Sequence, residues 1–315
     1  MMENLVFSLN STIPIFLLMM LGYLFKRIGW VDEVFASKMN KFVFTVPLPV
    51  LVFKDLAEAD FRSAWDGKFV LFCFLVTVAS IILVTGISFL FKDKSIQAEF
   101  VQSAFRSSAA LLGIAFIQNI YGNSGMAPLM IIGSVPLYNV FAVVILSALK
   151  PENRGISKDV VKKTLLGILK NPILIGIEVG IIFSLLRIPL SGIPAKTVSS
   201  IAMTATPLGL IAMGASLDFK KALGKIVPSI VATFMKLVGL TAIFLPLAIH
   251  FGFRESQLIA ILVMLGSATT VSCFVMAKNM GHEGVLSSSV VMLTTLFSAF
   301  TLTFWLWLIK SLGLI

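Results

Sequence analysis

Charged residues, cysteine and histidine are all scarce in this sequence. Charged residues make up 13% of its 315 residues, whereas a soluble domain carries about a quarter. The two cysteines, Cys73 and Cys273, and the two histidines, His250 and His282, stand far apart. That spacing excludes a disulfide framework and the usual pattern of zinc ligands. We therefore expect no metal and no cofactor.

Motifs that carry catalytic chemistry are also missing. The chain has no G-x-x-x-x-G-K-[ST] phosphate loop, which argues against ATP hydrolysis. It has neither a nucleophile elbow nor a metalloprotease helix. An arginine-rich voltage-sensor helix and a selectivity-filter motif are absent as well. The chain is therefore predicted not to be an enzyme.

Apolar residues dominate the amino-acid composition. They make up 58% of the chain, and the mean hydropathy is +1.00. Most of them fall in continuous runs of about 20, the length that a helix needs to cross a bilayer. The runs lack the alternation of barrel strands. We predict an all-α polytopic membrane protein with ten transmembrane helices, at residues 4–25, 38–57, 68–91, 104–122, 125–149, 171–187, 197–217, 226–251, 257–279 and 285–310.

Basic residues are distributed unevenly between the predicted loops. Most lysines and arginines follow odd-numbered helices, and six of them lie in the connection 150–170. The positive-inside rule then places this connection in the cytoplasm and both termini outside the cytoplasm. A net charge of +10 is explained by such a membrane-facing surface. We expect a multi-pass protein of the cell membrane, with the lipid bilayer and no nucleic acid as its partner.

Several matches between the two halves of the chain suggest an internal repeat. Their offsets are all close to about 159 residues, half the chain. Each copy would contain five helices. Because five is an odd number, the second copy must cross the membrane in the opposite orientation to the first, as in many secondary transporters. We predict repeats at 1–149 and 171–315, joined by 150–170. The matches are Pro14 to Gly22 with Pro172 to Gly180, Pro47 with Pro207, Gly122 with Gly281, and Gly125 with Gly284.

The fourth and ninth predicted helices contain polar and helix-breaking residues. A break in lipid leaves backbone groups unpaired, so it persists only where it lines a cavity or is packed in protein. Freed N–H groups at a helix start can also hold an anion. The alternative is that these small residues serve close helix packing. The candidate breaks are Ser107, Ser108 and Gly113 in one helix and Gly266, Ser267, Thr269, Thr270 and Ser272 in the other, with Asn119 as a further polar residue.

Two long stretches resemble the auxin efflux carrier family. They are "FRSSAALLGIAF…YGNSGMAP…SVPLYNVFAVVIL" and "LGSATTVSCFVMAKNMGHEGVLSSSVVMLTTLFS". The resemblance covers almost the whole chain. The family usually reads Arg-Gly-Asn before the first crossover, whereas this chain reads Arg106-Ser107-Ser108, and it also lacks the crossover prolines.

This resemblance implies a fold and a mechanism. Helices 1, 2, 6 and 7 would form a scaffold, and helices 3–5 and 8–10 a transport domain in which broken helices 4 and 9 cross. A homodimer through the scaffold is implied as well. The sequence "VPLYN" is close to the family pattern, which makes Tyr138 and Asn139 cavity residues.

Two ionisable residues inside predicted spans are candidates for proton or ion coupling. Glu178 lies between Gly176 and Gly180, and a membrane-embedded acid suggests a function. Its alternative is a helix-packing site. Lys236 could pair with Glu178, contact the substrate, or extend toward an interface. Arg106, at the cytoplasmic start of the fourth predicted helix, could attract anions to an entrance, but topology alone explains it.

The sequence as a whole favours a secondary transporter. Its substrate would be a small organic anion, a mono- or dicarboxylate of the auxin or malonate/malate type, moved by alternating access. One alternative is a channel-like anion pathway. A second, with less support from the sequence, is a membrane-embedded receptor or enzyme.

Overall fold

A computed structural model describes residue 14 and residues 17–58, 66–109, 114–121, 125–149, 172–216 and 223–315. These residues form helices and connecting segments, with no strand among them, so the predicted all-α class is confirmed for this part of the chain. Five spans within it are long and apolar enough to cross a membrane. They are Gly67–Ser88, Leu129–Ala148, Gly192–Ala215, Ile226–His250 and Val285–Ser311. The connection 150–170 lies outside the described residues.

The helices follow the apolar runs of the sequence. After a helix at 17–27, the first half contains α2 (Glu33–Thr45), α3 (Pro47–Ala57), α4 (Gly67–Ser88), α5 (Gln97–Phe105), α6 (Ile114–Tyr121) and α7 (Ala127–Ala148). The second half contains α9 (Pro172–Leu185), α10 (Gly192–Ala215), α12 (Ile226–Phe234), a π-helical turn (Met235–Gly239), α13 (Leu240–His250), α14 (Glu255–Gly266), α15 (Ser272–Asn279) and α16 (Val285–Ser311).

Several predicted boundaries were wrong, and two of the predicted helices differ most from the structure. The segment predicted as one helix at 38–57 is two helices, α2 and α3, which meet at Val46. Pro47 explains this break, because proline disfavours helical geometry in the residue before it. The helix predicted from residue 104 already begins at Gln97, whose side-chain amide donates to the Ser88 carbonyl at 2.9 Å.

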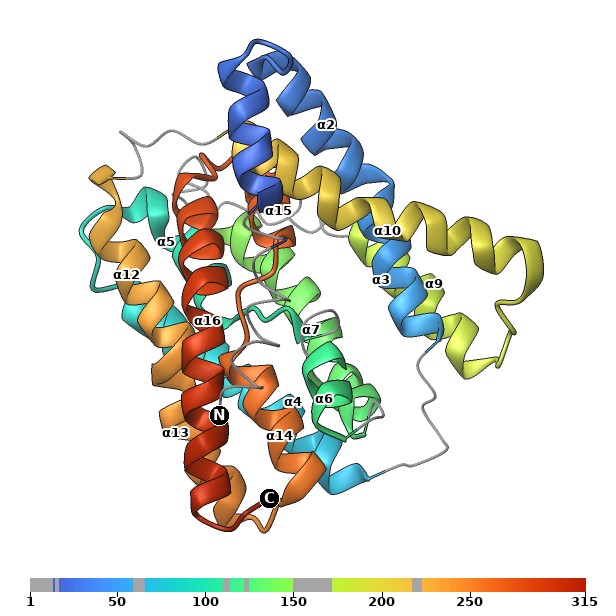
Figure 1. The fold of residues 1–315 in the computed structure, drawn as a ribbon, viewed down its shortest axis with the longest axis vertical. Coiled ribbons are helices and arrows are strands. Elements are labelled where there is room, and N and C mark those ends of the chain that lie inside the picture. The colour runs from blue at the N-terminus through green and yellow to red at the C-terminus, as the bar shows by residue number, and fades with distance from the viewer. Residues whose placement is uncertain are drawn as a thin grey trace, which may run out of the picture.

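The helices α2, α3, α9 and α10 pack on one another and form one side of the molecule (Figure 1). Glycine allows α9 to lie close to α3. A Cβ atom at Gly176 would come 2.5 Å from the Pro49 carbonyl oxygen, and one at Gly180 would come 2.9 Å from that of Phe53. Small residues are the usual means of close packing between membrane helices. We call these four helices, with helix 17–27, the panel.

The remaining helices form a larger bundle, which holds α4–α7 and α12–α16 (Figure 1). Most of the fully buried apolar side chains belong to it, and every residue from Leu258 to Gly266 on α14 is buried. Contacts of α2 and α10 with α15, and of α7 with α9, join the panel to the bundle. The candidate functional site is a cavity where the two groups meet.

Candidate functional site

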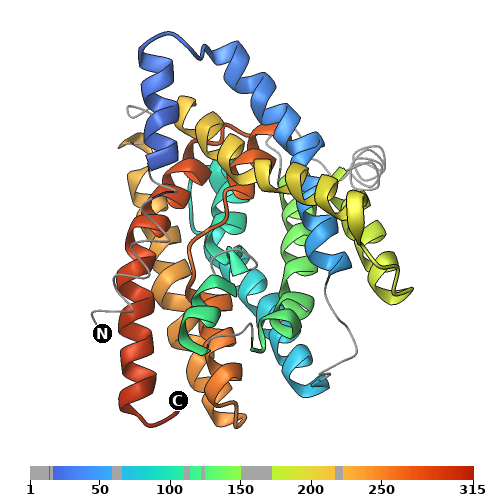
Figure 2. The same cartoon turned by 45° about the vertical axis from the view of Figure 1, so that its right-hand side comes forward.

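Two helix ends meet in the middle of the bundle. Helix α5 ends at Phe105, and Arg106 is extended. Helix α14 ends at Gly266, Ser267 is extended, and the helix resumes with α15 (Figure 2). The Ser108 backbone N–H donates to the Ala268 carbonyl at 2.9 Å, so the two non-helical segments contact each other directly. The predicted residues Ser107, Ser108, Ser267, Thr269 and Thr270 therefore lie where the described backbone leaves the helix, and Ser272 begins α15.

Side chains from each segment bind carbonyl groups of the opposite helix. The Ser107 hydroxyl donates to the Met264 carbonyl at 2.6 Å. The Thr269 hydroxyl donates to the Ser103 carbonyl at 2.8 Å, and the Thr269 N–H donates to the Thr294 hydroxyl at 3.0 Å. Because the last carbonyls of a helix have no partner within it, these hydroxyls supply the missing hydrogen bonds. This exchange stabilises a break that lipid alone would not tolerate.

Lys236 adds a positive charge behind the break. Its side chain is fully buried, and its ammonium group donates to the Leu265 carbonyl and the Ser107 hydroxyl, both at 2.5 Å. The lysine lies in the π-helical turn, a local irregularity that is frequent at functional sites. A cation at the C-terminal end of α14 offsets the negative end of the helix dipole. The alternative that Lys236 extends toward an interface is wrong, because the side chain is entirely enclosed.

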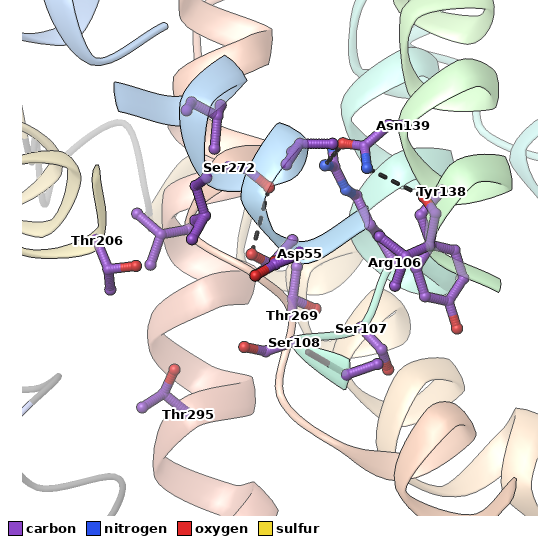
Figure 3. Close-up of a pocket in the computed structure, with 17 residues that line it drawn as sticks. Asp55, Arg106, Ser107, Ser108, Tyr138, Asn139, Thr206, Thr269, Ser272 and Thr295 are labelled. Atoms are coloured by element: carbon purple, nitrogen blue, oxygen red, sulfur yellow. Dashed lines mark hydrogen bonds between the residues drawn. The ribbon is translucent and has the colours of Figure 1, made fainter. Parts of the chain in front are cut away.

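A cavity of about 110 Å³ opens beside the two helix ends. A single water needs only about 10–15 Å³ by the same measure, so the cavity has room for a small solute. Both groups of helices contribute to its wall (Figure 3). The panel contributes Leu48, Leu51, Val52, Asp55 and Thr206, and the bundle contributes Arg106, Ser107, Ser108, Ala109, Val135, Tyr138, Asn139, Thr269, Thr270, Val271, Ser272 and Thr295.

Arg106 is the cation of the cavity wall. It is only 3% exposed, and its guanidinium group donates to the Asn139 side-chain oxygen and contacts the Met276 sulfur. Asn139 is itself held by its amide, which donates to the Val135 carbonyl at 3.0 Å. Arg106 forms no ion pair with any residue in the described part of the chain. A buried cation without a carboxylate partner provides a strong attraction for an anion that enters the cavity.

The structure brings most of the predicted site residues together. Those that line the cavity are Ser107, Ser108, Tyr138, Asn139, Thr269, Thr270 and Ser272. Ser267 lies behind the wall and donates to the Ser107 hydroxyl at 3.2 Å, and Gly266 ends α14 next to it. Gly113 lies outside the described residues. Asn119 belongs to α6, and its side chain is not among those described.

Glu178 lies away from the cavity. Its side chain is exposed on α9. Gly176 and Gly180 are four residues apart and therefore share the face that packs on α3, whereas Glu178 points to the other face. The small-residue pattern around it thus serves helix packing, and no described contact joins Glu178 to Lys236.

Sequence reasoning missed Asp55, Thr206 and Thr295, and it assigned Arg106 to topology alone. Asp55 carried a usable signal, because it is an acid inside the predicted span 38–57, and such residues suggest a function by default. Thr206 and Thr295 carried none, since a single threonine in a membrane helix is common. Their place in the cavity depends on how α10 and α16 pack.

Comparisons with known proteins agree with the helical membrane architecture. A family model described as "Membrane transport protein" matches residues 7–306. The chain is also similar to an "Uncharacterized transporter" of Methanothermobacter thermautotrophicus. The two are 22% identical over 310 residues, which cover 95% of this chain and 97% of the relative.

Proposed function

The chain belongs to the auxin efflux carrier family of membrane transport proteins, and on this premise we propose that it is a secondary transporter for a small organic anion. The substrate is a mono- or dicarboxylate, and it binds in the cavity between the panel and the bundle. Transport proceeds by alternating access across the cell membrane.

One observation carries this proposal, namely the buried guanidinium of Arg106 at the cavity wall, which forms no ion pair within the described part of the chain. Arginine presents several N–H donors in a planar fork that matches a carboxylate. Asn139 fixes the guanidinium, so little side-chain freedom is lost when an anion binds. The hydroxyls of Ser108, Thr270 and Ser272 line the same space and offer further donors.

The proposed architecture explains how the cavity reaches both sides of the membrane. Ten spans form two inverted five-helix repeats, with both termini outside the cytoplasm. The interrupted helices α5/α6 and α14/α15 cross near the middle of the bilayer, where substrate sites of such carriers lie. The panel is the scaffold, and the bundle moves past it as a rigid body. The cavity wall comes from both groups, so this movement would open it first to one side and then to the other.

The driving force is a proton gradient or the membrane potential. The potential supplies about 2.3 kcal/mol per elementary charge per 100 mV, which favours export of an anion from a negative interior. Of the two residues first considered for coupling, Lys236 has the better position, because its ammonium group touches the break. Glu178 has an exposed side chain on α9 and would act only from outside the cavity.

A flux assay on the purified chain in proteoliposomes tests the function. A panel of radiolabelled mono- and dicarboxylates is offered at a clamped membrane potential. We expect saturable uptake of at least one of them, and acceleration of its efflux by the same solute outside. Flux without saturation or acceleration would indicate the alternative, a channel-like pathway. Absence of flux for every carboxylate would refute the proposal.

A further inference from the structure

Asp55 is the carboxylate of the cavity wall. It lies on α3 of the panel, is partly buried, and lines the same space as Arg106 of the bundle (Figure 3). Among the described residues it accepts no hydrogen bond and forms no ion pair. A carboxylate that lines the proposed anion site, with no hydrogen-bond or ion-pair partner among the described residues, opposes the very ligand that Arg106 attracts. This conflict calls for an explanation beyond simple binding.

No other ionisable group of the neighbouring helices takes the role of Asp55. On α3 itself, Lys54 and Glu58 pair with each other at 3.0 Å. The charged residues of the helices packed against α3 are all exposed, and none lines the cavity. They are Glu33, Lys38 and Lys41 on α2, Glu178 on α9 and Lys196 on α10. Among the described residues of the wall, Arg106 and the phenol of Tyr138 are the remaining ionisable groups.

We propose that Asp55 binds the proton that is transported with the substrate anion, so that the carrier is an electroneutral proton and carboxylate symporter. This inference rests on the proposed function. In the empty carrier the ionised Asp55 balances the charge of Arg106 across the cavity. In the loaded carrier the substrate carboxylate takes over that balance, and Asp55 is neutral because it holds a proton.

The physical reason is that an enclosed site resists a change of its net charge. Moving an uncompensated charge through a membrane domain is costly. With Asp55 as the proton acceptor, the cavity gains one negative charge from the substrate and one positive charge from the proton. An O–H bond forms on the carboxylate with a proton from the entry side, and the same bond breaks toward the exit side. The empty and loaded cavities then carry equal charge, so the membrane potential opposes the change of access in neither state.

Coupling of this kind has a quantitative signature. For one proton per monoanion, each unit of pH difference changes the accumulation ratio tenfold, and the membrane potential has no effect. A carrier of the bare anion behaves in the opposite way. Its accumulation ratio does not depend on the pH difference and changes tenfold for each 59 mV of membrane potential.

The experiment compares the wild-type chain with Asp55→Asn in proteoliposomes, using a monocarboxylate that the wild type transports. The pH difference and the potential are set independently. We expect the wild type to follow the pH difference, with one proton taken up per substrate. Asp55→Asn should lose accumulation driven by the pH difference and keep exchange of internal for external substrate. Glu58→Gln is the matched control, because it makes the same chemical change on α3 outside the cavity.

Several results would overturn the inference and leave the proposed function intact. One is a wild type that transports carboxylate but ignores the pH difference. Another is an Asp55→Asn variant that still accumulates substrate in response to it. If Asp55→Asn yields no active protein, the test rests on Asp55→Glu and on the wild-type measurement. The glutamate variant retains an acid, so we expect it to retain the coupling of transport to the pH difference. Transport by Asp55→Glu without coupling contradicts the inference, whereas lack of any flux in the wild type refutes the function itself.

Discussion

The two helix interruptions occupy related places in the chain but carry different chemistry. The segment after α5 starts with Arg106, whose guanidinium faces the cavity. The segment after α14 offers only small residues and hydroxyls, among them Thr269. Its positive charge comes from elsewhere, namely from Lys236 in the π-helical turn. The comparison suggests a division of labour in which the first segment recognises the ligand charge and the second keeps the crossing intact.

Removal of the guanidinium should have the largest effect on transport. Arg106→Gln keeps a polar side chain but leaves a substrate carboxylate without its charge partner. Loss of one member of a buried charge pair costs about 2–4 kcal/mol, or roughly 30- to 1,000-fold in affinity. Arg106→Lys should fall in between, because it keeps the charge and loses the fork. Saturation curves of carboxylate uptake measure the effect of both variants. Equal kinetics in the wild type and in Arg106→Gln would show that Arg106 is not part of the substrate site.

Removal of the ammonium group should affect stability more than recognition. Lys236→Met keeps the length of the side chain but removes the donor of the Leu265 carbonyl, whereas the Ser107 hydroxyl still accepts from Ser267. An unsatisfied buried acceptor costs about 1–3 kcal/mol. A thermal-unfolding scan in detergent should therefore show a clear drop in the unfolding temperature. The control Lys225→Met breaks an exposed pair with Glu283 and should change stability by less than about 1 kcal/mol. A larger effect in the control would contradict the assigned role.

Removal of single hydroxyl groups should have the smallest effects. It also best separates recognition of the ligand from support of the helix crossing. Thr269→Val removes the bond to the Ser103 carbonyl, and we expect a loss of about 1 kcal/mol of folding stability. Ser108→Ala removes a hydroxyl of the cavity wall that has no hydrogen-bond partner among the described residues. It should raise the half-saturating substrate concentration a few-fold and leave the unfolding temperature unchanged. The reverse pattern in these two variants would invalidate the division between recognition and support.

Much of the site could be predicted because breaks in membrane helices leave a local trace. Serine, threonine and glycine inside an apolar run indicated where the backbone leaves the helix at Ser107 and Ser267. The partners of these residues could not be predicted. Ser107 binds the Met264 carbonyl, which is 157 residues away along the chain, and such a pairing depends on how the helices pack. Asp55, in contrast, could have been predicted from the sequence. It is an acid inside a predicted span, and the rule that singled out Glu178 applies to it as well.

The sequence by itself determined that this protein is helical and built for the membrane, because apolar runs of bilayer length admit few other structures. It also determined the family, through motifs that extend over nearly the whole chain. Only the tertiary structure decided where the charged residues lie. It buried Lys236 and Arg106, turned Glu178 outward and brought Asp55 to the cavity. The reason is that the effect of a charge depends on its surroundings, and those surroundings come from helices that are distant along the chain.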